Sequence, residues 1–375
     1  MAYIRHIPPA VADGRLAQVY KEIRDGVPRV PNLMQVFSLR PETMEGVYHS
    51  WLALMWAGRV QRQTKELMAV VVSGAARCEY CVDSHMVFAQ AAGMASDKCF
   101  EVERLLDDAT SLEERERLAV RYAAKVTAEP RGVQAGDRMM LARGWPSIEE
   151  RVEILATISA LNAVSRVANT LGVALEIPAT VRRYAAGRRG AIAMLSRLTA
   201  VSVDLGERSI SASPPERNRE AMRELFCEQL GFGQVPPGFE LLEVCPEAFD
   251  GQLRIMKKSV AVLPRDRWMR LGLIVGRLTG CDYFATHCAQ WLTSRGEDPA
   301  DVIAASEGSP SRLPDAETCC LRFTRDLTLH SHTMGEDRVH ELRRHGLSDG
   351  AVLDVAFVGG VFNGMTRLVL GLAPF

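Results

Sequence analysis

The chain of 375 residues contains the same sequence pattern twice. Short matching stretches recur in the same order about 200 residues apart, with only small changes in spacing. The matches are Val30-Pro31 with Val235-Pro236, Pro41-Glu42 with Pro246-Glu247, Cys78-Glu79-Tyr80 with Cys281-Asp282-Tyr283, Arg121-Tyr122 with Arg322-Phe323, Asn162 with Asn363, and Arg166 with Arg367. An ordered series of this kind predicts a tandem duplication of one structural unit. We therefore predict a first domain over residues 1–178, a linker over 179–215 and a second domain over 216–375.

Each copy has the hydrophobic periodicity of helices. Leucine, valine and isoleucine recur three or four residues apart among charged residues, for example over 105–126 and 152–164. Alternating strand-like segments are nearly absent, and the apolar run 67–76 has flanking residues that favour a buried helix. Proline and glycine mark the helix ends. The predicted fold is all-α, with two tandem helical bundles of roughly six helices each.

Composition excludes several classes of protein. Lys and Arg number 45 and Asp and Glu 46, so the chain has no general attraction for nucleic acid or for an anionic membrane. The run 67–76 is far shorter than the roughly 20 residues of a membrane span. The apolar C-terminal segment, 351–375, is interrupted by Asp354, Asn363 and Arg367 and is predicted to be a buried packing helix.

The N-terminus and the cysteines favour a cytoplasmic protein. The first ten residues, MAYIRHIPPA, lack the apolar core of a signal peptide. The nine cysteines are odd in number and irregularly spaced, which is typical of reduced thiols rather than of a disulfide framework.

Residues 77–85, RCEYCVDSH, place two cysteines and a histidine close together. On a helix, Cys78, Cys81 and His85 fall within about 60° of one face. Two thiols three residues apart can form a disulfide, and a histidine one turn later can accept or relay a proton. Because only a thiolate attacks a peroxide or another disulfide, such a site requires something that lowers a thiol pKa.

Three other interpretations compete with a redox site. Zinc could use Cys78, Cys81, His85 and Glu66, but the first copy has no second ligand pair of the usual kind. A thioredoxin-type CxxC follows a β-strand in an α/β fold, and that alternation is absent. The third interpretation is a pair of inert buried cysteines beside a hydrogen-bonded histidine.

Glu66 followed by Cys78-x-x-Cys81-x-x-x-His85 resembles the active-site motif of the alkyl hydroperoxidase D-like group in the carboxymuconolactone decarboxylase superfamily. Residues 30–37 (VPNLMQVF) and 160–173 (ALNAVSRVANTLGV) are similar to segments of its peroxidase-related members. The resemblance covers most of 15–177. It implies an all-helical fold that assembles into trimers or hexamers, so a homo-oligomer is expected.

The resemblance also implies roles for the site residues. Cys81 corresponds to the thiol that attacks a peroxide, and Cys78 to the thiol that then closes a disulfide. Glu66 and His85 correspond to the proton relay. Tyr80 stands where the best-known hydroperoxidase of the group has a further histidine, so its catalytic role is open. We expect a small-molecule peroxide or oxidisable intermediate as substrate, a dithiol or thiol-redox protein as reductant, and no cofactor or metal.

Two other functions are compatible with the sequence. The decarboxylase branch of the superfamily uses acid/base residues on a lactone or small acid, for which a CxxC pair is not required. Alternatively, the protein is a redox sensor or a partner-binding protein that does not turn over a substrate.

The second copy has lost most of the predicted site. Glu66, Cys81 and His85 correspond to Met269, Phe284 and Cys288, so only Cys78 of the four positions is retained, as Cys281. We expect the second copy to fill the position of a catalytic subunit in a pseudo-symmetric assembly; the alternative is a pocket of its own.

Two features have less specific interpretations. The adjacent Cys319 and Cys320 could be redox-active but are more typical of buried helix cysteines. The basic stretch RRYAAGRRG, 182–190, could bind an anion or a partner, but we interpret it as a solvated connector.

Overall fold

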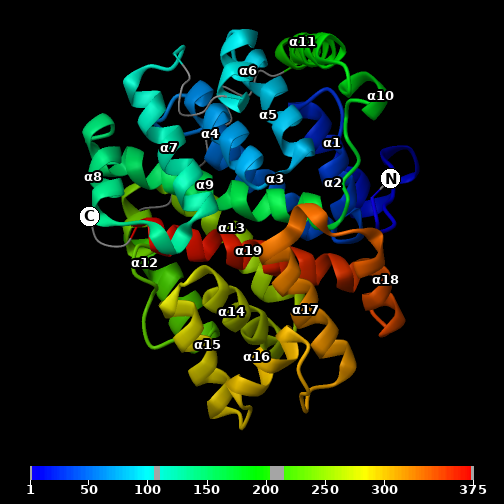
Figure 1. Cartoon of the computed structure of the whole chain (residues 1–375), viewed down its shortest axis with the longest axis vertical. Coiled ribbons are helices and arrows are strands. Elements are labelled where there is room, and N and C mark those ends of the chain that lie inside the picture. The colour runs from blue at the N-terminus through cyan, green and yellow to red at the C-terminus, as the bar shows by residue number, and fades with distance from the viewer. Residues whose placement is uncertain (1, 105–109, 203–214, 373–375) are drawn as a thin grey trace.

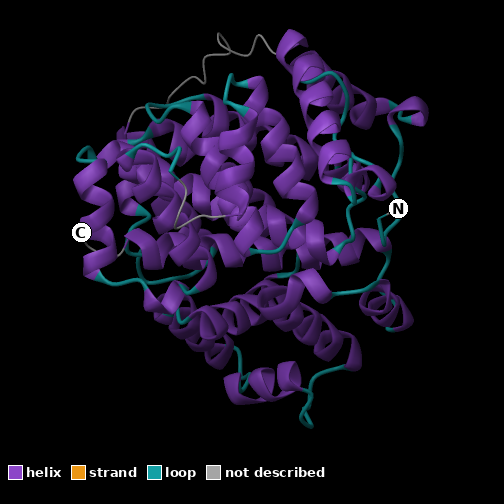
Figure 2. Cartoon of the chain, turned by 45° about the horizontal axis from the view of Figure 1, so that its top comes forward, coloured by secondary structure: helices purple, strands orange, loops and turns teal. Residues whose placement is uncertain are grey.

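The computed structural model describes residues 2–104, 110–202 and 215–372, and these contain helices and loops but no strand (Figure 2). The predicted all-α fold is confirmed. The first half contains α1 (Gly14–Gly26), α2 (Asn32–Val36), α3 (Pro41–Trp56), α4 (Arg62–Ala75), α5 (Glu79–Ala91), α6 (Ser96–Arg104), α7 (Glu114–Ala128), α8 (Ala135–Gly144) and α9 (Ile148–Thr170).

Two helices, α10 (Ala179–Arg182) and α11 (Ala185–Ser202), follow the first half. The second half contains α12 (Pro215–Arg223), α13 (Pro246–Val262), α14 (Arg265–Thr279), α15 (Asp282–Ser294), α16 (Pro299–Glu307), α17 (Asp315–His330), α18 (Glu336–Arg344) and α19 (Asp349–Leu372). Short 3-10 turns lie at Pro9–Val11, Phe37–Leu39, Pro130–Gly132, Glu240–Val244 and Ser331–Thr333, and a π-helical segment lies at Glu224–Gln229.

The helices from α3 to α9 recur in the same order from α13 to α19. A proline occupies the first turn of both α3 and α13, where its missing N–H has no helical partner to lose. The turn that ends α4 also matches the turn that ends α14. In both turns the N–H of the cysteine, Cys78 or Cys281, donates to a carbonyl five residues earlier at 2.8 Å. The common origin of the halves stays a prediction, and the repeated architecture agrees with it.

The same buried hydrogen bonds hold the last long helix in each half. An asparagine on that helix donates to a threonine 35 residues earlier, and an arginine one turn later donates to the asparagine oxygen. The residues are Asn162, Thr127 and Arg166 in the first half and Asn363, Thr328 and Arg367 in the second, with distances from 2.8 to 3.0 Å. These bonds satisfy polar groups that would otherwise be costly in the core.

The halves join through equivalent helices. Helix α9 packs along α19 through the middle of the molecule, and α3 packs on α13 (Figure 1). Glycines allow the close approach: a Cβ on Gly364 would lie 2.6 Å from the Ser159 carbonyl oxygen, and one on Gly360 would lie 2.8 Å from that of Ala163. Contacts between matching elements are the pattern of a two-fold interface.

Helix α19 is long and apolar enough to cross a membrane, and it is the one helix of that kind among the described residues. In its most apolar window, 94% of the residues are buried inside the protein. It packs against α9, α14 and α17. The core therefore accounts for its apolarity, as the prediction of a buried packing helix required.

Helices α10 and α11 pack on the first half, mainly on α5. Arg182 and Arg188 both donate to the carboxylate of Asp83, at 2.8 Å, and Arg188 also pairs with Glu103 at 2.8 Å. The interpretation of the basic stretch as a solvated connector is therefore wrong, because Asp83 is buried and needs these cations. The sequence between the halves also contains the Ser/Pro-rich stretch SISASPPERNRE, 209–220, interpreted as a linker; its first part, 209–214, lies outside the described residues, and α12 begins at Pro215.

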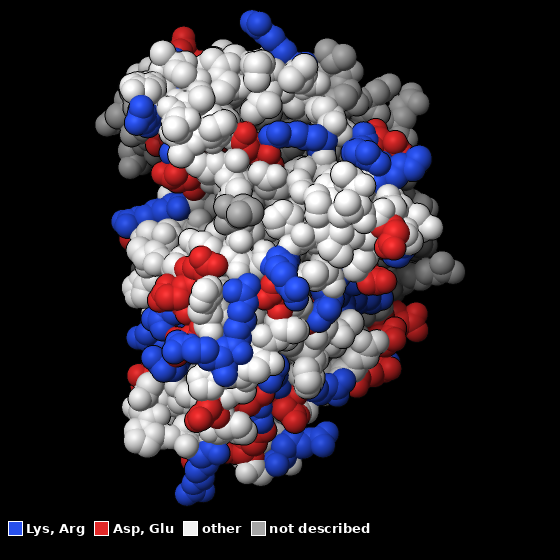
Figure 3. All heavy atoms as spheres, turned by 90° about the vertical axis from the view of Figure 1, so that its right-hand side faces the viewer, with Lys and Arg blue, Asp and Glu red and all other residues white. Residues whose placement is uncertain are grey.

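Charges of both signs are mixed on the surface. The face in Figure 3 carries basic and acidic side chains next to one another rather than a continuous basic surface. This distribution accords with the formal net charge of −1.

Candidate functional site

The turn between α4 and α5 sets the geometry of the site. Helix α4 ends at Ala75, and Arg77 follows with φ 53°, the one non-glycine among the described residues with a positive φ. A left-handed backbone costs a non-glycine residue about 1–2 kcal/mol. It reverses the chain so that α5 runs back along α4. The exposed guanidinium of Arg77 contacts the His332 ring at 3.1 Å and does not point to the thiols.

The structure brings Glu66 of α4 and His85 of α5 together. Nδ1 of His85 lies 2.8 Å from a Glu66 carboxylate oxygen, and Glu66 is completely buried. This bond fixes the orientation of the imidazole ring and leaves Nε2 available to another partner. The pair can take up or deliver a proton at the end of a cavity.

Arg62 belongs to the same network, although it lies outside the predicted site residues. Its Nε lies 3.5 Å from the second Glu66 oxygen, and its guanidinium stacks on the Trp56 ring at 3.1 Å from the centroid. Burial lowers the pKa of Arg62, and the charge of Glu66 opposes that effect. The i, i+4 spacing of Arg62 and Glu66 on a helix is the signal that could have identified it.

The two cysteines differ in their electrostatic environment. Cys78 precedes the first residue of α5 as its N-cap rather than lying within the helix, which corrects the predicted placement; Cys81 lies in the first turn. A hydrogen bond from the Cys78 thiol lowers the pKa of Cys81, and His85 and Ser165 lower it further. Burial raises the pKa of Cys78 well above its ordinary value. The pKa of Cys81 is therefore the lower of the two, so Cys81 loses its proton before Cys78 does.

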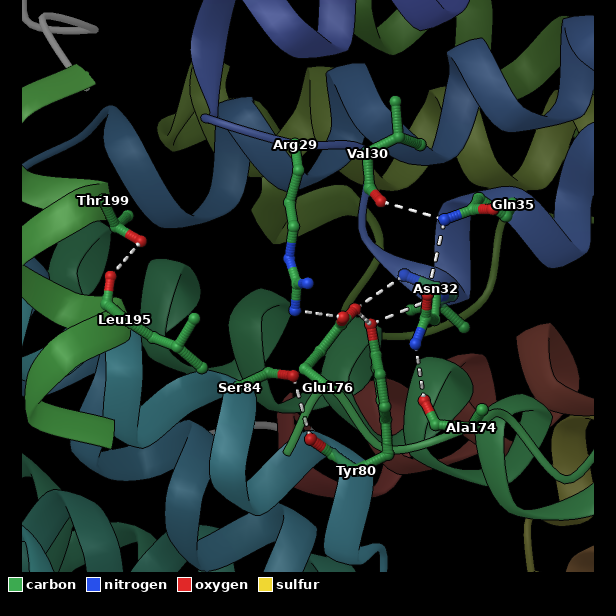
Figure 4. A network of polar contacts seen from close by, with 11 residues as sticks. Arg29, Val30, Asn32, Gln35, Tyr80, Ser84, Ala174, Glu176, Leu195 and Thr199 are labelled. Atoms are coloured by element: carbon green, nitrogen blue, oxygen red, sulfur yellow. Dashed lines mark hydrogen bonds and ion pairs between the residues drawn. The ribbon is translucent and has the colours of Figure 1, made fainter. Parts of the chain in front are cut away.

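Tyr80 is directed away from this network. Its hydroxyl accepts the Leu33 N–H at 3.1 Å and donates to Glu176 at 3.2 Å (Figure 4). Glu176 also accepts the Asn32 N–H at 2.7 Å and pairs with Arg29. Burial raises the pKa of Tyr80 well above its ordinary value, so the hydroxyl stays protonated. Tyr80 ties the start of α5 to the first turn of α2.

A cavity of about 390 Å³ opens beside the thiols. Cys81, His85 and Tyr80 line it, whereas Cys78 and Glu66 do not, so only one of the two cysteines faces this space. Aromatic residues, among them Trp51 and Phe88, form much of the wall. A small molecule in the cavity would meet Cys81 and His85.

The geometry does not favour the zinc alternative. Within the described parts of the chain, one set of three possible ligand groups lies within 4.8 Å of one another, and it is Glu22, Glu45 and His49, which are only half-buried. The two cysteines and His85 do not form such a set.

The corresponding region of the second half is filled. Phe284 stands where the first half has Cys81, and it packs edge-on against Phe362 at 5.6 Å. Trp268 approaches the same Phe362 ring at 4.3 Å. Met269, the counterpart of Glu66, is also buried. Aromatic packing thus takes the place of the thiol site.

The remaining cysteines singled out by the sequence are buried thiols. Burial raises the pKa of Cys319 to about 11 and that of Cys320 to about 12. Burial also raises the pKa of Cys281 to about 11. None of these three is poised as a thiolate near neutral pH.

The fold and the site together define a class: an all-helical protein with a buried cysteine pair, in which the cysteine with the lowered pKa lies near a His–Glu pair. Residues 41–125 match the model of the carboxymuconolactone decarboxylase family. Over this segment the chain is similar to carboxymuconolactone decarboxylases and to an alkyl hydroperoxide reductase.

Comparison with individual proteins gives more distant similarities. An alkyl hydroperoxide reductase of Mycobacterium tuberculosis is 31% identical over 96 residues, which are 25% of this chain and 28% of the length of that relative. The alkylhydroperoxidase AhpD core structure of an uncharacterized peroxidase-related protein from Ralstonia eutropha is 21% identical, with a TM-score of 0.45, over 53% of this chain and 97% of its own. A peroxidase-related protein from Silicibacter sp. is 19% identical, with a TM-score of 0.41, over 45% and 90%.

Proposed function

We propose that the first half of the chain is a thiol-dependent oxidoreductase that reduces a hydroperoxide through Cys81 and Cys78. The observation that carries the proposal is the position of Cys81. It lies in the wall of a cavity, its pKa is lowered, and it neighbours a histidine held by a buried carboxylate. Reactive cysteines are characterised by a stabilised thiolate that a substrate can reach.

The proposed reaction has two steps on the protein. The Cys81 thiolate attacks the terminal peroxide oxygen, the O–O bond breaks, and the departing alkoxide takes a proton from the His85–Glu66 pair and leaves as an alcohol. Cys81 becomes a sulfenic acid. The Cys78 thiol then attacks that sulfur, forming the disulfide and releasing water. A dithiol or a thiol-redox protein returns two electrons and two protons.

The second half has a supporting role in this proposal. Its counterpart of the site is packed with aromatic rings, and its α13 and α19 cover α3 and α9 of the first half. We further propose that the protein forms a homo-oligomer, which light scattering tests directly: a strict monomer contradicts this part.

Mass spectrometry of cysteine variants tests the proposal. After cumene hydroperoxide is added, we expect loss of two hydrogens at Cys78 and Cys81 and no change at the other cysteines. Cys78→Ser should stop at a Cys81 sulfenic acid, and Cys81→Ser should not oxidise rapidly. Cys99→Ser is the matched control, because Cys99 is a buried thiol whose pKa burial raises to about 12.

Two results favour the other functions. Oxidation to the disulfide without sustained peroxide consumption in the presence of dithiols indicates a sensor. Activity on a lactone or small acid that survives Cys81→Ser indicates the acid/base chemistry of the decarboxylase branch.

A further inference from the structure

The cavity beside Cys81 is much larger than a simple peroxide requires. A water molecule, which is close in size to hydrogen peroxide, occupies roughly 30 Å³ of the liquid, whereas this cavity measures about 390 Å³. That volume lies in the range of sites for organic small molecules, roughly 300–1,000 Å³. The space is therefore suited to a ligand with a substantial carbon skeleton.

The chemistry of the wall is apolar and aromatic. Tyr48, Trp51 and Phe88 line one part of the cavity, with ring centroids 6.1 Å apart for the first pair and 5.3 Å apart for the second. Leu54 and Leu161 are among the aliphatic residues of the wall. Binding of an apolar ligand to such a surface is favourable, because apolar surface on both the ligand and the wall is removed from water.

The charged groups of the wall already have partners within the described chain. Arg29 pairs with Glu176 at the exposed edge, and His85 pairs with Glu66. Asp83 accepts hydrogen bonds from two arginines of α10 and α11. An ionised ligand would have to compete for these charges, whereas a neutral ligand would not.

Helix α11 closes one side of the cavity. Leu195, Leu198 and Thr199 belong to the wall, and Figure 4 shows Leu195 and Thr199 on α11 across from Glu176. Ile255 of α13 contributes from the second half. All four residues lie outside the segment 41–125 that matches the family model. The size of the cavity is thus determined partly by segments outside that core.

We infer that α11, which lies outside the segment 41–125, determines how large an organic hydroperoxide the site accepts, and that the cavity favours a neutral and mainly apolar carbon skeleton. The inference rests on the proposed function for the hydroperoxide group, but the fit of the carbon skeleton can be measured without any chemistry. Leu195 is then a specificity-determining residue.

Binding of unreactive alcohols tests the inference independently of turnover. In full-length Cys81→Ser protein, titration calorimetry with 1-butanol, 1-hexanol and 1-octanol should show an affinity that rises by about fourfold per methylene, the factor expected for burying a CH₂ group. Decanoate should bind more weakly than 1-decanol. Equal affinity across the series, or tighter binding of decanoate, overturns the inference.

A pair of variants on α11 tests the role of the helix. Leu195→Trp, made in the Cys81→Ser protein, should reduce the affinity for 1-decanol at least tenfold while binding of 1-butanol is retained. Met194→Trp is the matched control, because Met194 is 57% exposed and does not line the cavity. If both variants bind 1-decanol like the parent protein, α11 does not limit the site.

Kinetics separates the inference from the proposed function. With Cys81 intact, kcat/KM for cumene hydroperoxide should exceed that for hydrogen peroxide at least tenfold, and Leu195→Trp should reduce this ratio. Equal values of kcat/KM for the two peroxides contradict the inference but are compatible with the proposed thiol peroxidase function. If alcohols bind but no peroxide is reduced, the cavity accepts the carbon skeleton as inferred, and the proposed peroxide reduction is wrong.

Discussion

Nδ1 of His85, on the same helix as Cys81, lies 2.8 Å from the buried carboxylate of Glu66 on the preceding helix. If this pair delivers the proton to the leaving alkoxide, Glu66→Gln should lower the rate of peroxide reduction by about 10²–10⁴, the usual contribution of general acid/base catalysis. Stopped-flow measurement of Cys81 oxidation gives this rate. Glu22→Gln is the control, since Glu22 makes a similar 2.6 Å contact with His49 away from the cavity; an equal loss in both variants contradicts the relay.

The pKa values of the two cysteines predict the pH dependence of alkylation. Because the pKa of Cys81 is lowered from 9.0, its reaction with iodoacetamide should rise with pH and reach half of its maximal rate below pH 9. Cys78, whose pKa is raised well above 9.0, should react only in strongly alkaline solution. Peptide mass spectrometry resolves the two rates. Faster labelling of Cys78 at pH 7 would reverse the proposed roles.

Arg62 should influence the same pH profile without contacting a substrate. Its positive charge lies 3.5 Å from Glu66, and a buried carboxylate is disfavoured in its charged form when that cation is removed. A neutral Glu66 no longer stabilises a positive charge on His85, and that charge lowers the pKa of Cys81. In Arg62→Met the pH at which Cys81 alkylation begins should therefore be higher, and Arg62→Lys should restore part of the shift. Arg59→Met, at an exposed arginine that approaches Glu149, should leave the profile unchanged. An unchanged profile in Arg62→Met shows that Arg62 serves packing alone.

The ion pairs of α11 should determine how firmly this helix is held. Arg188 bridges Asp83 and Glu103 with a side chain that is only 14% exposed. Arg188→Met should weaken the docking of α11 by on the order of 2 kcal/mol, less than the loss of a fully buried pair because Arg182 still contacts Asp83. Hydrogen exchange of the α11 backbone should become faster.

Arg189 offers the matched control for this experiment. It pairs with Asp97, whose side chain is 92% exposed, so Arg189→Met should change the exchange of α11 very little. Similar exchange in both variants means that apolar packing alone holds the helix.

The contact between α9 and α19 should be sensitive to a single methyl group. A Cβ on Gly364 would lie 2.6 Å from a backbone oxygen, so we expect Gly364→Ala to lower the free energy of unfolding by about 1–3 kcal/mol. Gly190→Ala in α11 meets no atom within 4 Å and should instead gain up to about 1 kcal/mol from helix propensity. Urea unfolding measures both changes; stabilisation by Gly364→Ala would show that the helices can move apart without cost.

The local features of the fold were predictable because they depend on residues close in the sequence. The spacing of Cys81 and His85 indicated that both lie on one helix, although Cys78 is its N-cap and not part of it, and the apolar run before them indicated a buried helix that carries Glu66. The recurrence of Asn162 and Arg166 as Asn363 and Arg367 indicated equivalent helices. Periodicity and repetition can be read from the sequence alone, so these helices could be predicted without knowing any tertiary contact.

The cavity could not be predicted, because its wall comes from segments distant in the sequence. Arg188 was interpreted as solvated, but its partner Asp83 lies 105 residues earlier. The hydroxyl of Tyr80 reaches Glu176 across 96 residues. Leu195 lies in the wall of the same cavity as Cys81, on a helix that Arg188 attaches to α5. Only the folded chain shows that a segment between the two copies helps to build the site.

Because α9 and α19 belong to one polypeptide, the interface between the two halves does not depend on protein concentration. Two separate chains with this interface would part as their concentration fell, whereas tethered modules experience an effective concentration in the millimolar range. Ile255 of the second half therefore lies in the wall of the same cavity as Cys81 at any expression level. Both halves of the chain therefore contribute to the cavity wall however few copies the cell makes.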